Sequence, residues 1–290
     1  MKLLIDGKYM TGLFAFYVDA ILSLKEYYQE YLQGKLDSAQ FYKAMLEDVE
    51  LARVPGFGKY SMERISLTPI NDRLPLETMM EYLVNNDILP VQKNIYEGFK
   101  EYREYIRKNY NHGDFFTCIA PEDERFLYVL AKIKQPKRVF VAGAYYGYFA
   151  IWAMPFIKEN NGNCVLSDID EEVCKLAKKN FINLGYGDNV EVYNEDSAIL
   201  LEKRTEPIDM LILDATGRHD DPRPEYRGKR IYGTFLQKAK HLLSKGSFII
   251  IHNMEPKNSD MKVLVDELQS LNALGTSYET FNGLGVYIMV

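Results

Sequence analysis

The 290-residue sequence predicts an α/β fold with a doubly wound, mostly parallel sheet over residues 113–290 and a helical extension over residues 1–112. Two observations predict this fold. In the second part, short apolar runs alternate with segments of helical spacing, as in sheets whose parallel strands are joined by crossover helices. The runs VFVA, CVLS, MLIL and FIII are also apolar throughout, which is typical of strands buried on both faces.

The expected elements of the second part follow in a regular order. A helix starts at Pro121, and a glycine turn follows the first strand. Strands are expected at 138–141, 164–168, 190–193, 208–214 and 247–252, with helices at 147–158, 170–184, 196–203, 229–243 and 259–271. The Asn282-Gly283 pair indicates a hairpin, so the last strand is expected to run antiparallel to its neighbour.

The first part is expected to be helical, with helices at 12–33, 38–52, 75–86 and 90–110 and with Ser38 as an N-cap. Tyrosines are frequent in these helices. The most evident are Tyr27, Tyr28, Tyr31, Tyr42, Tyr96, Tyr102 and Tyr105. They indicate amphipathic packing or a dimer interface, or alternatively an aromatic surface that lines a substrate site. The region is therefore expected to serve as a lid, an acceptor site or a dimerisation element.

The composition excludes several classes of protein. A net charge of −6 argues against a nucleic-acid partner, which requires a basic surface. Three cysteines without CxxC spacing indicate neither a disulfide framework nor a zinc site. The N-terminal MKLLIDGKYM lacks the basic segment and apolar run of a signal peptide, and Asp19 interrupts the best apolar stretch. We expect a cytoplasmic protein without a membrane span.

A glycine loop directly after the first strand is the first candidate ligand site. It comprises Gly143, Ala144, Tyr145, Gly147 and Tyr148. Glycines at such a turn let the backbone approach a ligand closely, and the amides at the start of a helix favour a carboxylate. Two glycines at this spacing are also compatible with a plain strand-to-helix turn.

Polar residues follow each of the later strands. Asp168, with Ile169 beside it, ends the second strand, where a carboxylate accepts hydrogen bonds from ribose hydroxyls in doubly wound folds. Asp170 is expected to cap the next helix. Asp196 and Ser197 follow the third strand. They are expected either to bind the amino group of an adenine or to cap the next helix.

The fourth and fifth strands end in Asp214 and in His252-Asn253. The carboxyl ends of parallel strands meet in the crevice where open sheets bind ligands. A carboxylate, an imidazole and an amide oxygen there predict either a divalent-cation site or a buried, hydrogen-bonded histidine beside a turn residue.

These residues resemble the catechol and caffeoyl-CoA O-methyltransferase group, a class I family with a Rossmann-like fold that uses S-adenosylmethionine (SAM) and usually magnesium. The resemblance runs from about Thr117 to the C-terminus and includes TCIAPEDERFLYVL and GAYYGY. It implies that Asp168 binds ribose and that Asp214, His252 and Asn253 take the positions of metal ligands. Lys229 of the Lys-x-x-Tyr pattern takes the position of the general base. Asp214 is also expected to contact SAM.

Three positions depart from the pattern of the group. Val141 replaces an acid, Phe149 replaces a small hydroxyl residue, and His252 replaces a carboxylate ligand. The last change predicts weaker Mg²⁺ binding, another ion such as Mn²⁺, or no metal, and makes His252 a second candidate base. Because of an insertion over residues 216–228, the Lys-x-x-Tyr pattern lies later in the chain than in the group.

The resemblance implies SAM-dependent methylation of a small-molecule acceptor, with O-methylation as the main reaction. A metal-independent N-methyltransferase and a non-catalytic SAM-binding scaffold are the alternatives. The insertion and the N-terminal helices are expected to close over the acceptor. Three arginines of the insertion, Arg218, Arg223 and Arg227, either contact an acidic acceptor or lie on a solvated surface. The acceptor itself is not specified by the sequence.

Overall fold

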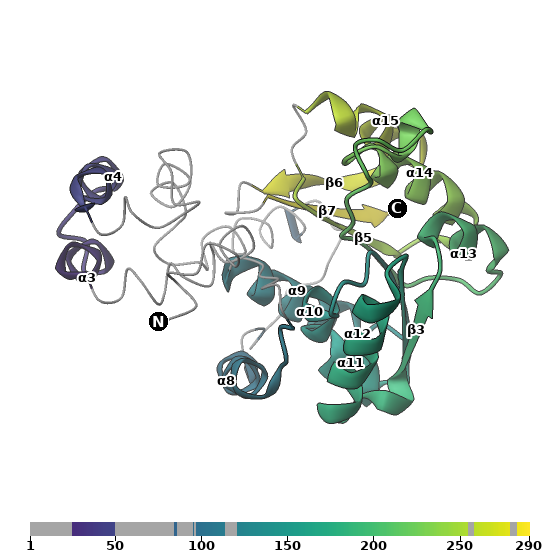
Figure 1. Cartoon of the computed structure of the whole chain (residues 1–290), viewed down its shortest axis with the longest axis horizontal. Helices are drawn as coiled ribbons and strands as arrows, with labels where there is room; N and C mark the ends of the chain where they lie inside the picture. Colours follow the sequence, from purple (N-terminus) through teal and green to yellow (C-terminus); the bar gives the residue numbers. More distant parts are fainter. Residues whose placement is uncertain are drawn as a thin grey trace.

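A computed structural model of the protein describes residues 25–49, 84–85, 95, 97–113, 121–254, 258–278 and 283–290. In this part of the chain seven strands form one sheet in the order β3-β2-β1-β4-β5-β7-β6 (Figure 1). The strands from β3 to β5 are parallel, and β7 runs antiparallel to both β5 and β6. The predicted doubly wound, mostly parallel sheet with an antiparallel C-terminal strand is confirmed.

The strands lie close to their predicted positions. They are β1 (Arg138–Ala142), β2 (Asn163–Asp168), β3 (Val190–Asn194), β4 (Met210–Leu213), β5 (Phe248–His252), β6 (Ala273–Tyr278) and β7 (Leu284–Met289). Every residue of β4 and β5 is buried, whereas β3 is partly exposed. This difference arises because β3 has a partner on one side only.

Helices precede and connect the strands. The α-helices are α3 (Glu26–Leu32), α4 (Ser38–Glu47), α8 (Phe99–Asn109), α9 (Pro121–Lys134), α10 (Tyr148–Ile151), α11 (Met154–Glu159), α12 (Glu171–Asn183), α13 (Ser197–Lys203), α14 (Ile231–Ala239) and α15 (Lys262–Ser270). Short 3₁₀ helices are η3 (Gly187–Asn189), η4 (Pro224–Tyr226), η5 (Lys240–Leu242) and η6 (Ser259–Met261).

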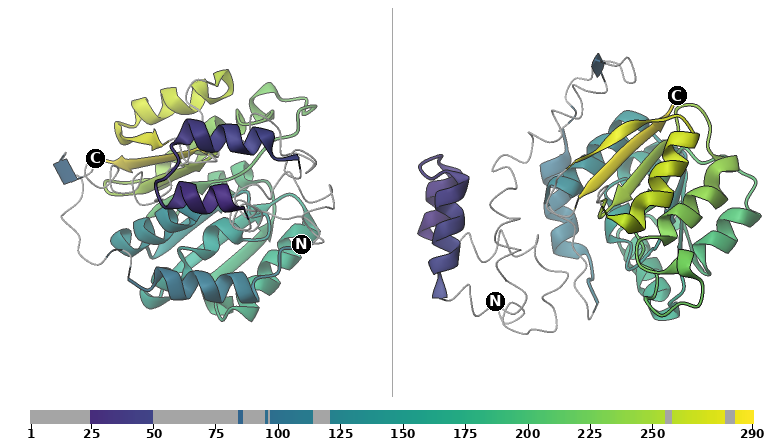
Figure 2. Two further views of the ribbon diagram at one scale, coloured as in Figure 1. Left: turned by 90° about the vertical axis from the view of Figure 1, so that its left-hand side faces the viewer. Right: turned by 90° about the horizontal axis from the view of Figure 1, so that it is seen from above.

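Helices cover both faces of the sheet (Figure 2), and an apolar core lies on each face. Successive residues of a strand point to opposite faces, so Val139 and Val141 enter one core and Phe140 and Ala142 enter the other. Helices α8 to α12 contribute to the first core, and α13 to α15 to the second. Val141, the position of the missing acid, is therefore a buried core residue.

The predicted helix over 147–158 is broken into α10 and α11. Pro155 lies in the first turn of α11, and its ring has no N–H to donate to the carbonyl of Ile151. That carbonyl accepts a hydrogen bond from Tyr102 Oη at 2.7 Å instead. Thus a residue of α8 satisfies the backbone group that the proline leaves unpaired.

The N-terminal helices differ in detail from the prediction. Asp37, not Ser38, caps α4, because its carboxylate accepts from Gln40 N at 2.8 Å while Gln40 Oε1 accepts from Asp37 N at 2.9 Å. The helix ends at Glu47, before the predicted residue 52.

Three of the expected tyrosines lie on α3, with their ring centroids 4.1–6.0 Å from that of Phe41 on α4. They are Tyr27, Tyr28 and Tyr31, and their contacts agree with the packing interpretation. The predicted helix residues 12–24, 50–52, 75–83, 86 and 90–94, as well as Tyr96, lie outside the described residues. The assignment of 1–112 as a lid, acceptor site or dimerisation element stays a prediction.

Candidate active site at the carboxyl edge of the sheet

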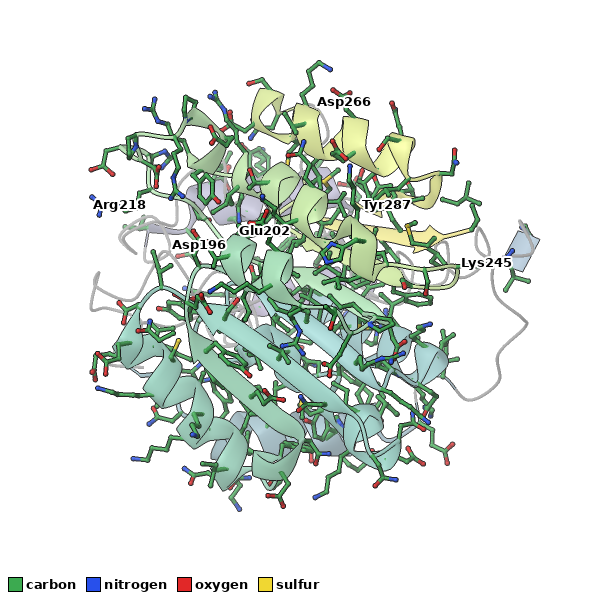
Figure 3. All side chains as sticks on the ribbon, turned by 90° about the vertical axis from the view of Figure 1, so that its right-hand side faces the viewer. Asp196, Glu202, Arg218, Lys245, Asp266 and Tyr287 are labelled. Atoms are coloured by element: carbon green, nitrogen blue, oxygen red, sulfur yellow. The ribbon has the colours of Figure 1, made fainter. Side chains whose placement is uncertain are left out.

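The register of the strands brings the predicted site residues to one edge of the sheet. Ala142, the last residue of β1, pairs with both Ser167 and Leu213. The residues that follow these strands therefore emerge side by side. Figure 3 shows Asp196 at this edge and Lys245, which precedes β5, at the opposite edge.

The glycine loop is a tight turn that accepts no side chain at its first glycine. Gly143 has φ +88°, and a Cβ atom there would lie 2.2 Å from the carbonyl oxygen of Asp214. The amides of Gly143 and Ala144 donate to Ser167 O at 3.1 and 2.9 Å, which fixes the turn to β2. Gly147, at φ +85°, has equally little room, with a Cβ position 2.4 Å from the Phe181 ring.

Asp168 closes the loop from the end of β2. Its carboxylate accepts from Tyr145 N at 3.0 Å and from Asp170 N at 3.2 Å. Burial raises the pKa of Asp168, and the backbone amides partly oppose that rise. The neighbouring Ile169 is 70% exposed at the same edge. Asp170 caps α12 by accepting from the amides of the first turn, as predicted.

Tyr145 and Tyr148, the aromatic members of the loop, differ in their surroundings. Tyr145 is half-buried, its ring centroid 4.2 Å from that of Tyr146. Tyr148 is buried and donates through Oη to Glu124 Oε1 at 2.7 Å. The Tyr148 side chain thus connects the loop to α9, and its assignment as a cofactor contact stays a prediction.

Asp196 and Ser197 connect the end of β3 to the neighbouring strand. Asp196 Oδ1 accepts from Ala198 N at 2.8 Å and caps α13. Ser197 Oγ lies 2.6 Å from Ser167 Oγ in a buried contact. Asp196 is thus a helix cap, which is one of its two predicted roles. The second carboxylate oxygen of Asp196, Oδ2, does not take part in the cap. A role in adenine recognition stays a prediction.

Asp214 and His252 form a close pair across β4 and β5. His252 Nδ1 lies 2.7 Å from Asp214 Oδ1. Burial raises the pKa of Asp214, but His252 and Lys229 outweigh burial and lower it below its usual value. The carboxylate is thus ionised and can only accept, so His252 Nδ1 carries the hydrogen of this bond.

The other side of the His252 ring faces a second carboxylate. Nε2 lies 3.9 Å from Asp123 Oδ2, and both side chains are buried. Within the described part of the chain, His252 Nε2 has no hydrogen-bond partner. The Phe149 ring lies against the imidazole with centroids 4.9 Å apart. The imidazole is therefore held between two acids and an aromatic ring.

Lys229, the other candidate base, donates to three oxygens. Its Nζ lies 2.7 Å from Ala215 O, 2.8 Å from Tyr232 Oη and 3.0 Å from Asn253 Oδ1. These contacts engage all three donors of an ammonium group. Tyr232 Oη in turn donates to His252 O at 3.1 Å. Lys229 thus ties together the backbone and side chains around the ends of β4 and β5.

Each of the three predicted metal ligands is engaged in a hydrogen bond with another side chain. Asp214 Oδ1 accepts from His252, Asn253 Oδ1 accepts from the Lys229 ammonium, and the hydrogen on His252 Nδ1 excludes that atom as a ligand. Among the described residues, no group of three or more His, Cys, Asp or Glu side chains is arranged to hold a metal ion. A divalent cation does not fit this donor set as arranged, since it would lie beside an ammonium group.

The sequence reasoning missed two buried acids in the first turn of α9. Asp123 faces His252, and Glu124 accepts from Tyr148 and, at 2.9 Å, from Arg103 Nε. Helical spacing contained a signal for Asp123. It lies three and four positions before Phe126 and Leu127, so it shares the face that was predicted to enter the core.

Comparisons with known proteins agree with this architecture. Residues 140–254, which span the glycine loop through Asn253, match the family model described as a methyltransferase domain. This match indicates a methyltransferase domain in that part of the chain. The SAH-bound methyltransferase PaMTH1 of Podospora anserina superposes with a TM-score of 0.50 and 16% identity, over 77% of this chain and 98% of that one. At this identity the superposition supports the fold of the domain.

A catechol O-methyltransferase of Niastella koreensis is 26% identical over 140 residues. The alignment covers 47% of this chain and 58% of that enzyme, so the chain spans little more than half the length of this relative. In the described part of the chain, no helix is long and apolar enough to cross a membrane.

Proposed function

We propose that this methyltransferase-domain protein transfers a methyl group from SAM to a hydroxyl of a small-molecule acceptor. One observation carries the proposal. The backbone of Gly143 lies directly against that of Asp214, so the loop that would bind the donor and the Asp214–His252 pair form one continuous site. The name of the relative from Niastella koreensis supports oxygen as the acceptor atom.

The residues at the edge of the sheet suit the chemical groups of SAM. The glycine at 143 lets the loop pack directly against the backbone of Asp214, and the half-buried Asp168 carboxylate suits two ribose hydroxyls. The cofactor carries a sulfonium and an ammonium group, and Asp214 and Asp123 bring negative charge to the β4–β5 end. Gly143, Ala144, Tyr145, Gly147 and Asp168 are therefore the residues that we propose to hold SAM.

We assign the general base to His252 rather than to Lys229. In a neutral imidazole the hydrogen on Nδ1 leaves a lone pair on Nε2, whereas Nζ of Lys229 donates to three oxygens. Asp214 keeps the imidazole in the required tautomer. The carboxylates of Asp214 and Asp123 flank the ring and stabilise it when it becomes positively charged.

The reaction then follows from the positions of these groups. When bound, SAM supplies an electrophilic methyl group on a sulfonium. His252 Nε2 takes the proton from the acceptor hydroxyl, and the oxygen gains the electron pair of the O–H bond. The oxygen–methyl bond forms as the methyl–sulfur bond breaks, and that electron pair remains on the sulfur of S-adenosylhomocysteine (SAH). The site aligns the acceptor oxygen with the methyl group.

The finer properties of the protein are part of this proposal. The two described cysteines, Cys164 and Cys174, are buried free thiols, which supports a reducing, cytoplasmic location. The tyrosine-rich N-terminal helices support a homodimer. A divalent cation in the site predicts that EDTA abolishes activity, whereas a metal-independent enzyme predicts that EDTA leaves activity unchanged. The contact between Lys229 and Asn253 supports the metal-independent enzyme.

A calorimetric titration with SAH, followed by a radiolabelled methyl-transfer assay on phenols, catechols and amines, tests the proposal. We expect SAH binding and transfer to hydroxyl acceptors. Transfer to amines alone would favour the N-methyltransferase, and SAH binding without any transfer would favour a scaffold. No SAH binding would contradict the assignment of the site.

We expect EDTA to leave the rate of transfer unchanged, because the ammonium of Lys229 already lies beside Asn253 Oδ1, one of the predicted metal ligands. The measurement is the initial rate after dialysis against EDTA, with and without added Mg²⁺ or Mn²⁺. Loss of activity that either ion restores would show that the site rearranges to bind metal.

A further inference from the structure

The insertion 216–228 is a closed loop at the carboxyl edge of the sheet. Gly217 and Gly228 exchange two backbone hydrogen bonds of 2.9 and 3.1 Å at its base. A Cβ atom on Gly217 would lie 1.6 Å from the carbonyl oxygen of Tyr226, so the loop can close only with glycine at this position. Arg227 Nε donates to Asp221 O at 2.6 Å and braces the loop from inside.

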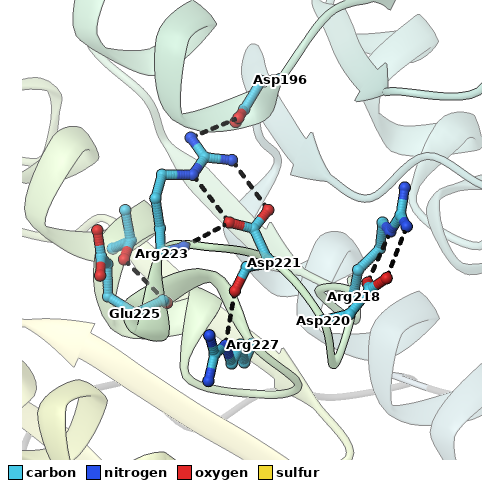
Figure 4. Close-up of polar contacts among 8 residues, drawn as sticks. Asp196, Arg218, Asp220, Asp221, Arg223, Glu225 and Arg227 are labelled. Atoms are coloured by element: carbon cyan, nitrogen blue, oxygen red, sulfur yellow. Dashed lines mark hydrogen bonds and ion pairs between the residues drawn. The ribbon is translucent and has the colours of Figure 1, made fainter.

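One guanidinium group in this loop is held in a fixed plane (Figure 4). Arg223 donates from Nε and Nη2 to the two oxygens of Asp221 at 3.0 and 3.1 Å. Its Cζ lies 3.4 Å from the centroid of the Tyr226 ring. One edge of the guanidinium is thus occupied by a carboxylate and one face by an aromatic ring, an arrangement that preorganises the group.

The fixed guanidinium points at the end of β3. Arg223 Nη1 lies 3.9 Å from Asp196 Oδ2, the carboxylate oxygen that does not cap α13. In the sheet order, β3 follows β2 on the side away from β1. A nucleoside whose ribose binds Asp168 at the end of β2 can therefore extend its base along this edge toward Asp196. Arg223 lies where that base would arrive.

We propose that Arg223 is a specificity-determining residue that stacks on the adenine of the cofactor with its outer face, while Tyr226 supports the inner face. Asp196 Oδ2 then accepts from the adenine amino group at the edge of the same site. A planar, delocalised guanidinium is suited to stacking on a flat ring. The inference rests on the proposed function and assigns the insertion to recognition of the nucleobase rather than of the methyl acceptor.

The test compares the dissociation constants of SAH and of adenosine, measured by calorimetry, for four proteins. They are the wild type, Arg223→Ala, Arg223→Lys and Arg218→Ala. We expect Arg223→Ala to weaken both ligands by about 5- to 100-fold, because a base stacked on a planar side chain loses that contact. Arg223→Lys keeps the charge but not the plane, so a similar loss is expected.

Arg218→Ala is the matched control. Arg218 belongs to the same insertion and pairs with the carboxylate of Asp220 through two hydrogen bonds of 2.9 and 3.0 Å, but both side chains are 72% exposed (Figure 4). Its removal changes the net charge equally, and we expect the two dissociation constants to stay within about twofold. Melting temperatures of all variants check that the fold is retained.

Three results would overturn the inference alone: unchanged affinities in Arg223→Ala, an equal loss in Arg218→Ala, or full affinity in Arg223→Lys. The first result would mean that Arg223 does not contact the ligand. Either of the other two would mean that Arg223 acts only through its positive charge. Failure of the wild type to bind SAH would overturn the proposed function, and this inference with it.

Discussion

Replacing His252 with asparagine is expected to lower the rate of the methyl-transfer step by about 10²- to 10⁴-fold. Asparagine can still donate a hydrogen bond to Asp214, as Nδ1 does at 2.7 Å, but it has no equivalent of Nε2. The variant therefore removes the proposed proton acceptor while keeping the contact that orients it. The measurement is the single-turnover rate at saturating SAM and acceptor.

The affinity for SAH separates a chemical role of His252 from a structural one. We expect the dissociation constant of SAH in His252→Asn to stay close to that of the wild type, since the proton acceptor acts on the methyl acceptor. A parallel variant, Lys229→Met, discriminates between the two candidate bases. Normal turnover in His252→Asn together with loss of turnover in Lys229→Met would show that Lys229, and not His252, is the general base.

Replacing Asp168 with alanine is expected to weaken SAH binding by at least about 100-fold. The two ribose hydroxyls would lose their hydrogen bonds to the carboxylate, and hydrogen bonds to a charged group contribute about 1.5–3 kcal/mol each. The same change removes the acceptor for Tyr145 N at 3.0 Å, which helps to hold the glycine loop. Calorimetric titration with SAH measures the effect.

Asp170 provides a control two residues away in the chain. Its carboxylate accepts from Glu172 N at 2.9 Å and Val173 N at 3.1 Å, as a cap of α12. Asp170→Ala should lower the free energy of unfolding by about 1 kcal/mol and leave SAH affinity unchanged. Equal losses of affinity in both variants, or none in Asp168→Ala, would refute the ribose assignment.

The sequence by itself determined the order and type of most elements of the sheet domain. Continuous apolar runs such as 248–251 identify buried strands regardless of what packs on them, because a strand covered on both faces needs no polar position. Polar residues directly after those runs then had to emerge at one edge, since parallel strands all end there. Asp168, Asp214 and His252 were therefore candidates without a structure.

Only the tertiary structure decided which atoms of these residues are already engaged by other protein groups and which can contact a ligand. Contacts such as those of Lys229 with Asn253 and of His252 with Asp123 join residues 24 and 129 positions apart, and no local spacing encodes them. The carbonyl of Ile151 that Pro155 leaves unpaired is satisfied by the distant Tyr102 hydroxyl, and the direction of Arg223 depends on a loop closed by two glycines. Local patterns specify secondary structure and strand ends, whereas partners across the sheet depend on how the whole chain packs.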